Sequence, residues 1–416
     1  MDKPMGMNKR MKTTDDRQIL YGLRVVDAAT YIAAPAAAAV LSDYGADVVK
    51  IERPPHGDPF RHLYRNPEFP PCAHNYPFIQ DNRNKRSLAL NLASPGGHTV
   101  FTRLIERADI LITNYQPQMQ RRFRIGYEDL APGNPRLIYA MITGYGEQGE
   151  EAEKPGYDMT AYYARSGLMN YMHAAGASPH VSPCGFGDHP SAMNLVSSIL
   201  LALYRRERTG KGGKVWTTLM HGGVWSNSSN VQGALLGAGQ PPRWTHSTAP
   251  NPFVNHYAAS DGQRFIFCLL DPGNDWPKLC RALERPELER DPRWATAALR
   301  MSANEDFIAL LDAEFARHPL AEWQRRFAAN DVLYGTVPDN ASVAADEQMA
   351  ANGVFLPLGD GGERTVASPM HVEGEAKRTA SWAPEVGEHS RQVLGELGFG
   401  EEEIAAFERE GVVTQR

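Results

Sequence analysis

Short apolar runs alternate with amphipathic segments through the first half of the chain. The apolar runs predict strands at 23–27 (LRVVD), 46–51 (ADVVKI), 87–92 (SLALNL), 109–113 (DILIT), 136–143 (RLIYAMIT) and 215–219. Between them, apolar residues at helical spacing predict helices at 35–44, 97–108 and 190–206. Strands that alternate with helices form βαβ units, so this half predicts an α/β fold with an open, mostly parallel sheet.

The pattern changes after residue 225. Residues 226–255 are rich in Gly, Pro, Asn and Ser and have little periodicity, which is typical of a linker. An apolar run at 264–270 and helical patterns at 276–283, 304–316 and 320–328 then predict a smaller α/β unit, and a last helix is expected at 391–397. The predicted organisation is a disordered leader at 1–19, a large domain at 20–225, a linker at 226–244, a small α/β domain at 245–345, and a linker with a C-terminal segment at 346–416 that returns to the large domain.

Charge and composition narrow the class of protein. The 416 residues carry 43 basic and 49 acidic side chains, a net charge of −6, so no global field favours nucleic acid. No apolar stretch is long enough to cross a bilayer, and the polar first 17 residues lack the apolar core of a secretory signal. The four cysteines have no CxxC spacing and the 13 histidines no ligand spacing, so no metal site is expected. We expect a soluble, cytoplasmic protein with no nucleic-acid or membrane partner.

One glycine motif is misleading. Residues 144–149 (GYGEQG) match GxGxxG and follow a predicted strand. In a dinucleotide-binding fold this loop opens a helix whose N-terminus holds the pyrophosphate. Here it leads into the acidic residues Glu150, Glu151 and Glu153 and then into Pro155-Gly156, which breaks a helix. The motif therefore does not predict a dinucleotide site.

Asp188 is a candidate reactive carboxylate. It lies in the sequence CGFGDHP (184–190), directly before the predicted helix at 190–206. Gly187 lets a substrate approach the backbone closely, and Pro190 suits the first turn of a helix. A helix N-terminus holds a carboxylate as the anion, which a nucleophilic carboxylate requires. From the residue type alone, a simple helix cap is the more common role, so both interpretations stay open at this point.

The order of several motifs resembles a known family. The segment 22–61 (GLRVVDAATYIAAPAAAAVLSDYGADVVKIERPPHGDPFR) is followed in order by 84–92 (NKRSLALNL), 108–115 (ADILITNY), 134–139 (NPRLIY), 144–146 (GYG), 155–158 (PGYD), 187–189 (GDH) and 387–389 (GEH). This series is similar to the class III CoA-transferases, the family of formyl-CoA transferase and carnitine CoA-transferase, to which α-methylacyl-CoA racemase is related. The resemblance spans residues of about 20 to 410.

The resemblance implies a fold, a reaction and a set of site residues. It implies a Rossmann-like large CoA-binding domain, a smaller α/β domain and an interlocked homodimer. Asp188 would be the nucleophile that moves CoA from an acyl-CoA to a carboxylic acid, with the thioester as substrate and no bound cofactor. The family's contacts with CoA would fall on Ile32, Ala33, Arg53, Leu90, Asn114, Tyr115 and Arg122, with Tyr157 and Asp158 nearer the thioester and Gly187 beside the nucleophile.

Departures from the family pattern bear on the substrate. A lysine that some relatives use for CoA falls on Ala93, and the tetraglycine loop of formyl-CoA transferase is absent, so a formyl or oxalate substrate is not supported. Aromatic and histidine side chains between the two predicted domains and in the small one suggest a larger aromatic or branched acid, unless they only pack the protein: Trp244, His246, Phe253, His256 and Tyr257.

Two alternative functions remain. The racemase branch needs a base and an acid on opposite faces of the α-carbon. Asp158 is present, but Ala131 and Ala258 stand where its relatives place the histidine and the glutamate. A non-catalytic CoA-binding protein is the second alternative, and the presence of Asp188 in its Gly-Asp step makes it the weaker one.

Overall fold

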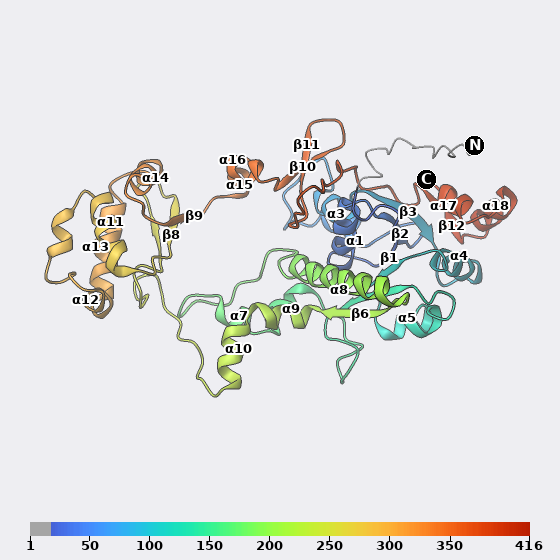
Figure 1. The fold of residues 1–416 in the computed structure, drawn as a ribbon, viewed down its shortest axis with the longest axis horizontal. Helices are drawn as coiled ribbons and strands as arrows, with labels where there is room; N and C mark the ends of the chain where they lie inside the picture. Colours follow the sequence, from blue (N-terminus) through green and yellow to red (C-terminus); the bar gives the residue numbers. More distant parts are fainter. Residues whose placement is uncertain (1–17) are drawn as a thin grey trace, which may run out of the picture. The chain divides into compact units, whose positions relative to one another are not determined.

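The computed structural model describes residues 18–416. Contacts within the chain divide it into two units (Figure 1). The first unit contains the described residues up to Met169 together with Val181–Leu235 and Gly353–Arg416, and the second contains Asn170–His180 and Leu236–Asn352. The predicted leader lies outside the described residues except for positions 18 and 19, and the predicted domain boundaries stay predictions.

A seven-stranded sheet forms the centre of the first unit. Its strands are β1 (Arg24–Ala28), β2 (Asp47–Glu52), β3 (Lys85–Leu90), β4 (Ile110–Thr113), β5 (Ile138–Thr143), β6 (Gly213–Thr218) and β12 (Val413–Thr414). They lie in the order β12-β3-β2-β1-β4-β5-β6, and every pair is parallel except β12 with β3. The order reverses between β1 and β4, as in a Rossmann-like fold. The predicted α/β class with a mostly parallel sheet is confirmed.

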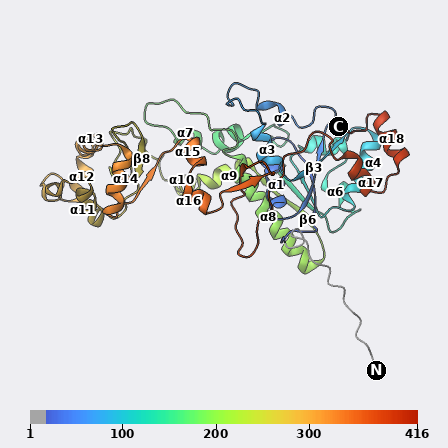
Figure 2. The same cartoon turned by 90° about the horizontal axis from the view of Figure 1, so that it is seen from above.

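Helices cover both faces of this sheet (Figure 2). Successive strand residues point to opposite faces, so Val25 packs with α1 (Ala33–Asp43) and α8 (Asp188–Thr209). Val26 faces the other way, toward α4 (Pro95–Ile105), α17 (Ser390–Glu396) and α18 (Glu401–Arg409). Burial on both faces explains why these strands are continuous apolar runs in the sequence.

The remaining elements of the first unit are short. They are α2 (Phe60–Leu63), α3 (Tyr76–Asn82), α5 (Pro117–Phe123), α6 (Tyr127–Leu130), η2 (Asp158–Ala164), α7 (Leu168–Tyr171, which continues into the second unit), α9 (Leu219–Ser226), α10 (Ser228–Leu235), β10 (Phe355–Leu358) and β11 (Glu363–Val366). Part of the segment that the composition predicts as a linker is thus the helix α10. None of its residues is buried, so it lacks the apolar stripe that marks a helix in a sequence.

The second unit is a small α/β structure. A three-stranded antiparallel sheet holds β7 (His256–Ala258), β8 (Arg264–Phe267) and β9 (Tyr334–Thr336). Its helices are α11 (Pro272–Ala282), η3 (Pro286–Arg290), α12 (Ala297–Ser302), α13 (Asn304–Phe315), α14 (Leu320–Ala329), α15 (Asn340–Ala344) and α16 (Glu347–Ala351). Phe253 and Tyr257 are 3% and 0% exposed in its aromatic core. These two rings therefore pack the unit, which is one of the two alternatives that the sequence left open for them.

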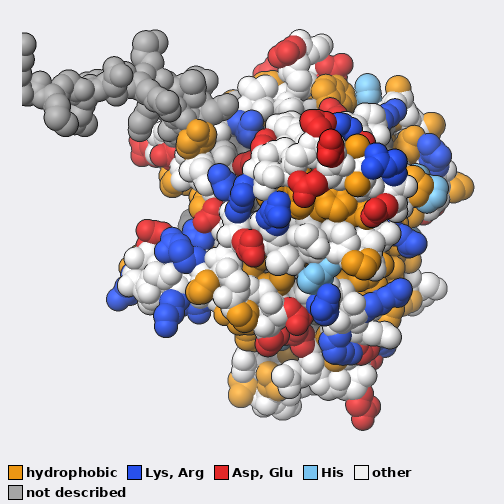
Figure 3. Space-filling view, turned by 90° about the vertical axis from the view of Figure 1, so that its right-hand side faces the viewer, with side chains coloured by type: hydrophobic (Ala, Val, Ile, Leu, Met, Phe, Trp, Pro, Cys, Tyr) orange, Lys and Arg blue, Asp and Glu red, His pale blue; other side chains and the backbone are white. Residues whose placement is uncertain are grey.

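The surface charge of the first unit is mixed. Figure 3 shows the face that carries α4, α17 and α18, where cationic and anionic side chains are interspersed. Charged side chains of this unit also pair, including Arg86 with Asp47 and Arg391 with Glu408. No helix within residues 18–416 combines the length and the apolar character needed to cross a membrane.

Candidate active site

The candidate site lies where the parallel strands of the first unit end. A pocket of about 80 Å³ opens at this edge, beside the reversal of strand order between β1 and β4. Open α/β sheets bind ligands at such a position. Five of the residues predicted from the sequence line it together: Ile32, Ala33, Asn114, Tyr157 and Asp188.

Asn114 ties together the two loops at this reversal. Its side-chain oxygen accepts a hydrogen bond from the Thr30 amide at 3.1 Å, and its amide nitrogen donates to the Thr30 carbonyl at 2.7 Å. The next residue, Tyr31, has a positive φ of 66°, and its amide donates to Asp58 at 3.1 Å. The loop before α1 is thus fixed by side chains from two neighbouring strand ends, which positions Ile32 and Ala33 in the pocket wall.

Asp188 is the first residue of α8 and is half-buried. The turn before it needs both of its glycines. A Cβ on Gly187 would lie 2.4 Å from Cγ of Tyr162, and Gly185 has a positive φ of 79°. Because only glycine fits at these positions, the turn packs tightly against η2, the helix that begins at Asp158.

The surroundings of Asp188 act on its pKa in the direction opposite to the effect expected of the helix N-terminus. Burial raises the pKa of Asp188 to about 8, and the negative charges of Asp158 and Asp81 add to the effect, while His189 acts in the opposite direction. The helix N-terminus therefore does not keep the pKa of this carboxyl low, because loss of water and repulsion between carboxylates outweigh it.

Asp158 is a second carboxylate without a cationic partner. It is 6% exposed, one oxygen accepts a hydrogen bond from the Met159 amide at 2.7 Å, and the other has no hydrogen-bond partner among the described residues. Burial raises the pKa of Asp158, although the backbone amides of Met159, Gly187 and Gly185 act against it. Two carboxyl groups with raised pKa values thus lie together at one turn, which is typical of functional sites.

Three neighbours of Asp188 were missed by the sequence reasoning. Nε2 of His189 lies 3.0 Å from an oxygen of Asp81, which is buried in α3. Burial lowers the pKa of His189, but the hydrogen bond and charge of Asp81 outweigh it, so the net pKa is raised. Burial, with the charges of Asp158 and Asp188, raises the pKa of the Cys184 thiol to about 11. The only sequence signal was the position of His189 and Cys184 in the segment around Asp188.

The other predicted site residues lie at the same edge of the sheet but do not line the small pocket. Leu90 is buried at the end of β3, and Tyr115 follows β4 and packs against Phe123. Arg53 directly follows β2, and Arg122 lies in α5; both are exposed, and neither forms an ion pair within residues 18–416. In this part of the chain no cluster of His, Cys, Asp and Glu could hold a metal ion.

Comparison with known proteins identifies the family. The family model described as CoA-transferase family III matches residues 20–390. The chain belongs to this family. It is 31% identical over 400 residues to (R)-2-hydroxy-4-methylpentanoate CoA-transferase of Clostridioides difficile, and the alignment covers 95% of this chain and 99% of that protein. It is 30% identical over 401 residues to cinnamoyl-CoA:phenyllactate CoA-transferase of Clostridium sporogenes, covering 95% and 97%.

A solved structure agrees with this assignment. A CAIB/BAIF family protein from Brucella suis superposes with a TM-score of 0.82 at 29% identity, covering 92% of this chain and 100% of that chain. The resemblance to class III CoA-transferases, the enzyme class and the fold class predicted from the sequence are thus confirmed.

Proposed function

We propose that this protein transfers CoA from an acyl-CoA thioester to a free carboxylic acid through a covalent intermediate on Asp188. The observation that carries the proposal is the position of Asp188 in the wall of the pocket at the sheet edge, with no ion-pair partner among the described residues. A carboxylate with a raised pKa is more basic once it is ionised, and no cation has to be displaced before it attacks.

The reaction proceeds by acyl exchange. An oxygen of Asp188 attacks the thioester carbonyl, the C–S bond breaks, and CoA leaves as the thiolate from an acyl-aspartyl anhydride. The thiolate then attacks the aspartyl carbonyl and releases the donor acid, which leaves an aspartyl-CoA thioester. The acceptor carboxylate opens this thioester by the same two steps in reverse, so that acyl-CoA forms and Asp188 is regenerated.

Backbone amides of α1 are suited to stabilise the oxyanion that each step creates. The first residues of a helix have N–H groups without intrahelical partners. Ala33 is the first residue of α1, lines the same pocket as Asp188, and is followed by Ala34. Donors fixed in a pocket stabilise developing charge without reorganisation.

The same edge of the sheet offers contacts for the rest of CoA. Arg53 and Arg122 are exposed cations that follow two strand ends, and a guanidinium suits a phosphate. Leu90, Tyr115 and Tyr157, with Asn114 and Asp158, complete the proposed binding set.

We also propose a homodimer, interlocked as the family resemblance implies. The first unit exposes large apolar side chains on α8, β6, α9 and α10: Leu201, Tyr204, Trp216, Trp225 and Leu235, each 56–77% exposed. These elements contact one another, and large apolar side chains exposed on neighbouring elements commonly mark a protein interface. Light scattering should therefore give twice the chain mass of 46.0 kDa, and a monomer at micromolar concentration would contradict the dimer.

Chemical trapping tests the covalent step. The protein is incubated with a donor acyl-CoA and then with hydroxylamine, which converts an activated carboxyl to a hydroxamate. Mass spectrometry of the peptides should find this change on Asp188 and not on Asp158, and only when acyl-CoA is present. If the α-proton of a 2-methylacyl-CoA exchanges with deuterium while Asp188 stays unmodified, the racemase alternative replaces the proposal. If CoA binds but neither reaction occurs, the protein is a CoA-binding protein.

A further inference from the structure

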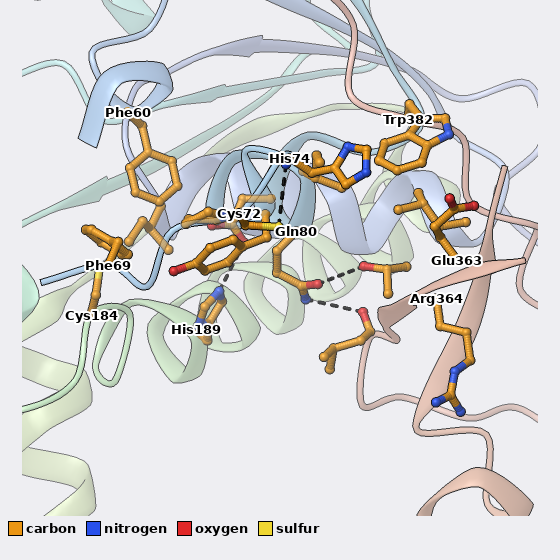
Figure 4. Close-up of a pocket in the computed structure, with 18 residues that line it drawn as sticks. Phe60, Phe69, Cys72, His74, Gln80, Cys184, His189, Glu363, Arg364 and Trp382 are labelled. Atoms are coloured by element: carbon orange, nitrogen blue, oxygen red, sulfur yellow. Dashed lines mark hydrogen bonds and ion pairs between the residues drawn. The ribbon is translucent and has the colours of Figure 1, made fainter. Parts of the chain in front are cut away.

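A second, larger pocket lies beside the small one in the first unit. Its volume is about 450 Å³, and Figure 4 shows its lining from the segment before α3, α3 itself, the turn before α8, and β11. Most of the wall is apolar or aromatic, with Phe60, Phe69, Tyr76, Ile79 and Trp382 among its members. Nothing in the proposed acyl exchange assigns a role to this pocket.

The pocket adjoins the proposed nucleophile. Ile32 lines both the small pocket and the large one, so its side chain forms part of the wall between them. His189, which directly follows Asp188, and Cys184 line the large pocket as well. A thioester carbonyl placed at Asp188 therefore has the large pocket within reach of its acyl chain.

Size decides which pocket can hold that chain. A cavity of about 150 Å³ binds a benzene ring. The small pocket, at about 80 Å³, is about half that size, whereas the large one, at about 450 Å³, has room for a ring and its linking carbons.

The polar groups of the large pocket are already engaged. Gln80 donates to the Val366 carbonyl at 3.2 Å and accepts from the Thr365 hydroxyl at 3.0 Å. His189 is held by Asp81, and the Arg364 guanidinium lies 5.2 Å from the ring of Phe355. The charged side chains of the lining are of both signs, Glu363 and Asp81 against Arg364 and His189, so the mostly apolar wall is the feature that bears on the acyl chain.

We infer that this pocket binds the acyl side chain of the substrate and selects acids with an aromatic or bulky branched side chain over short-chain acids. The inference rests on the proposed function, because the pocket is placed relative to Asp188. Phe69, Cys72 and Tyr76 are its specificity-determining residues, since they form the wall without contributing to the chemistry.

The exposed cysteines give a direct test of occupancy. Cys72 lies in the pocket wall, and Cys268 is an exposed cysteine of the second unit that serves as the internal control. Mass spectrometry measures the rate at which iodoacetamide alkylates each cysteine. The Asp188→Asn protein is used because it binds the thioester without reacting with it. Saturating 3-phenylpropanoyl-CoA should slow alkylation of Cys72 at least about fivefold relative to acetyl-CoA, with Cys268 unchanged. Equal protection of Cys72 by both thioesters would overturn the inference.

Two matched cysteine substitutions test selectivity in the active protein. Cys72→Trp fills part of the pocket and should lower kcat/KM for 3-phenylpropanoyl-CoA about tenfold while acetyl-CoA changes less than about twofold. Cys268→Trp adds the same side chain at the exposed cysteine of the second unit and should leave both values unchanged. Equal losses with both thioesters would overturn the inference while the CoA-transferase reaction stands. If the unsubstituted protein transfers CoA from none of the thioesters, the proposed function is wrong. The alkylation experiment still tests the pocket in that case, because it measures binding and not transfer.

Discussion

Two kinds of carboxylate in the first unit differ in their surroundings. Asp43 accepts hydrogen bonds from Arg83 at 2.9 and 2.7 Å, and Glu52 accepts two from Arg61, both at 2.8 Å. Asp188, in contrast, has no ion-pair partner among the described residues. A paired carboxylate contributes to the fold, whereas an unpaired one destabilises it and is retained where the protein uses its reactivity.

Two buried lysines form further ion pairs with buried carboxylates of the first unit. Lys50 and Lys85 are both fully buried and share Asp27, at 3.7 and 2.7 Å, while Lys50 also pairs with Asp58 at 2.9 Å. Burial lowers the pKa of Lys85 to about 8, with the charge of Asp27 acting against it. Asp58 holds the Tyr31 amide, so this charge network supports the loop that forms the wall of the site.

The largest effect is expected from removing the unpaired nucleophile. Asp188→Asn keeps the size of the side chain but cannot form the anhydride, so kcat for CoA transfer should fall by about 10³-fold or more. A coupled assay of acyl-CoA formation measures this. Asp339→Asn, at an exposed helix cap, is the control and should keep full activity because asparagine caps equally well. More than about a tenth of the activity in Asp188→Asn would refute the nucleophile.

Removing a paired carboxylate should instead damage the fold. Asp43→Asn leaves the buried guanidinium of Arg83 without its countercharge, and the free energy of unfolding should fall by about 3 kcal/mol. Asp47→Asn breaks the exposed pair with Arg86 and should cost less than about 1 kcal/mol. Urea denaturation followed by circular dichroism measures both values, and similar losses in the two variants would contradict the distinction.

Much of the fold of the first unit could be predicted from the sequence. Strands buried on both faces are apolar runs, and the predicted β1 and β4 agree with the structure within one residue at each end. The terminal strand β12 and the helix α10 were missed. β12 has only two residues, and none of α10 is buried, so neither produces a hydrophobic pattern.

The site was only partly predictable. The Gly-Asp step before a helix identified Asp188, because that chemistry is local in the sequence. The partner of His189 could not be found in this way, since Asp81 lies 108 positions away and meets it only through the packing of α3. The sign of the pKa shift of Asp188 also depends on burial and on Asp158, which no spacing in the sequence reveals.

The unpaired state of Asp188 should be visible in the pH dependence of stability. Folding raises the pKa of Asp188 from its usual 3.8 to about 8, so the protonated form is favoured in the folded protein. The stability that the folded protein gains from the protonated carboxyl is complete below pH 3.8 and is lost as the pH rises toward about 8. The Asp188→Asn side chain carries no charge at any pH. The free energy of unfolding of this variant, relative to the unsubstituted protein, should therefore increase over this range. Because Asp188 is only half-buried, the gain at pH 9 should be about 1–2 kcal/mol. Urea denaturation at pH 5 and pH 9 measures it, and a constant difference would contradict the assigned shift.

The smallest effect is expected when the neighbour of the nucleophile is neutralised. The ionised form of Asp188 attacks, so kcat/KM should rise with pH and level off above about 8. Asp158→Asn removes a negative charge that raises the pKa of Asp188, so the rising limb should move to lower pH by about one unit, or about 1.4 kcal/mol. The plateau rate should change less than the limb, because Asp188 itself is intact. Asp339→Asn should leave the profile unchanged. A limb that stays in place or moves to higher pH in Asp158→Asn would show that the repulsion between the two carboxylates does not set the ionisation of the nucleophile.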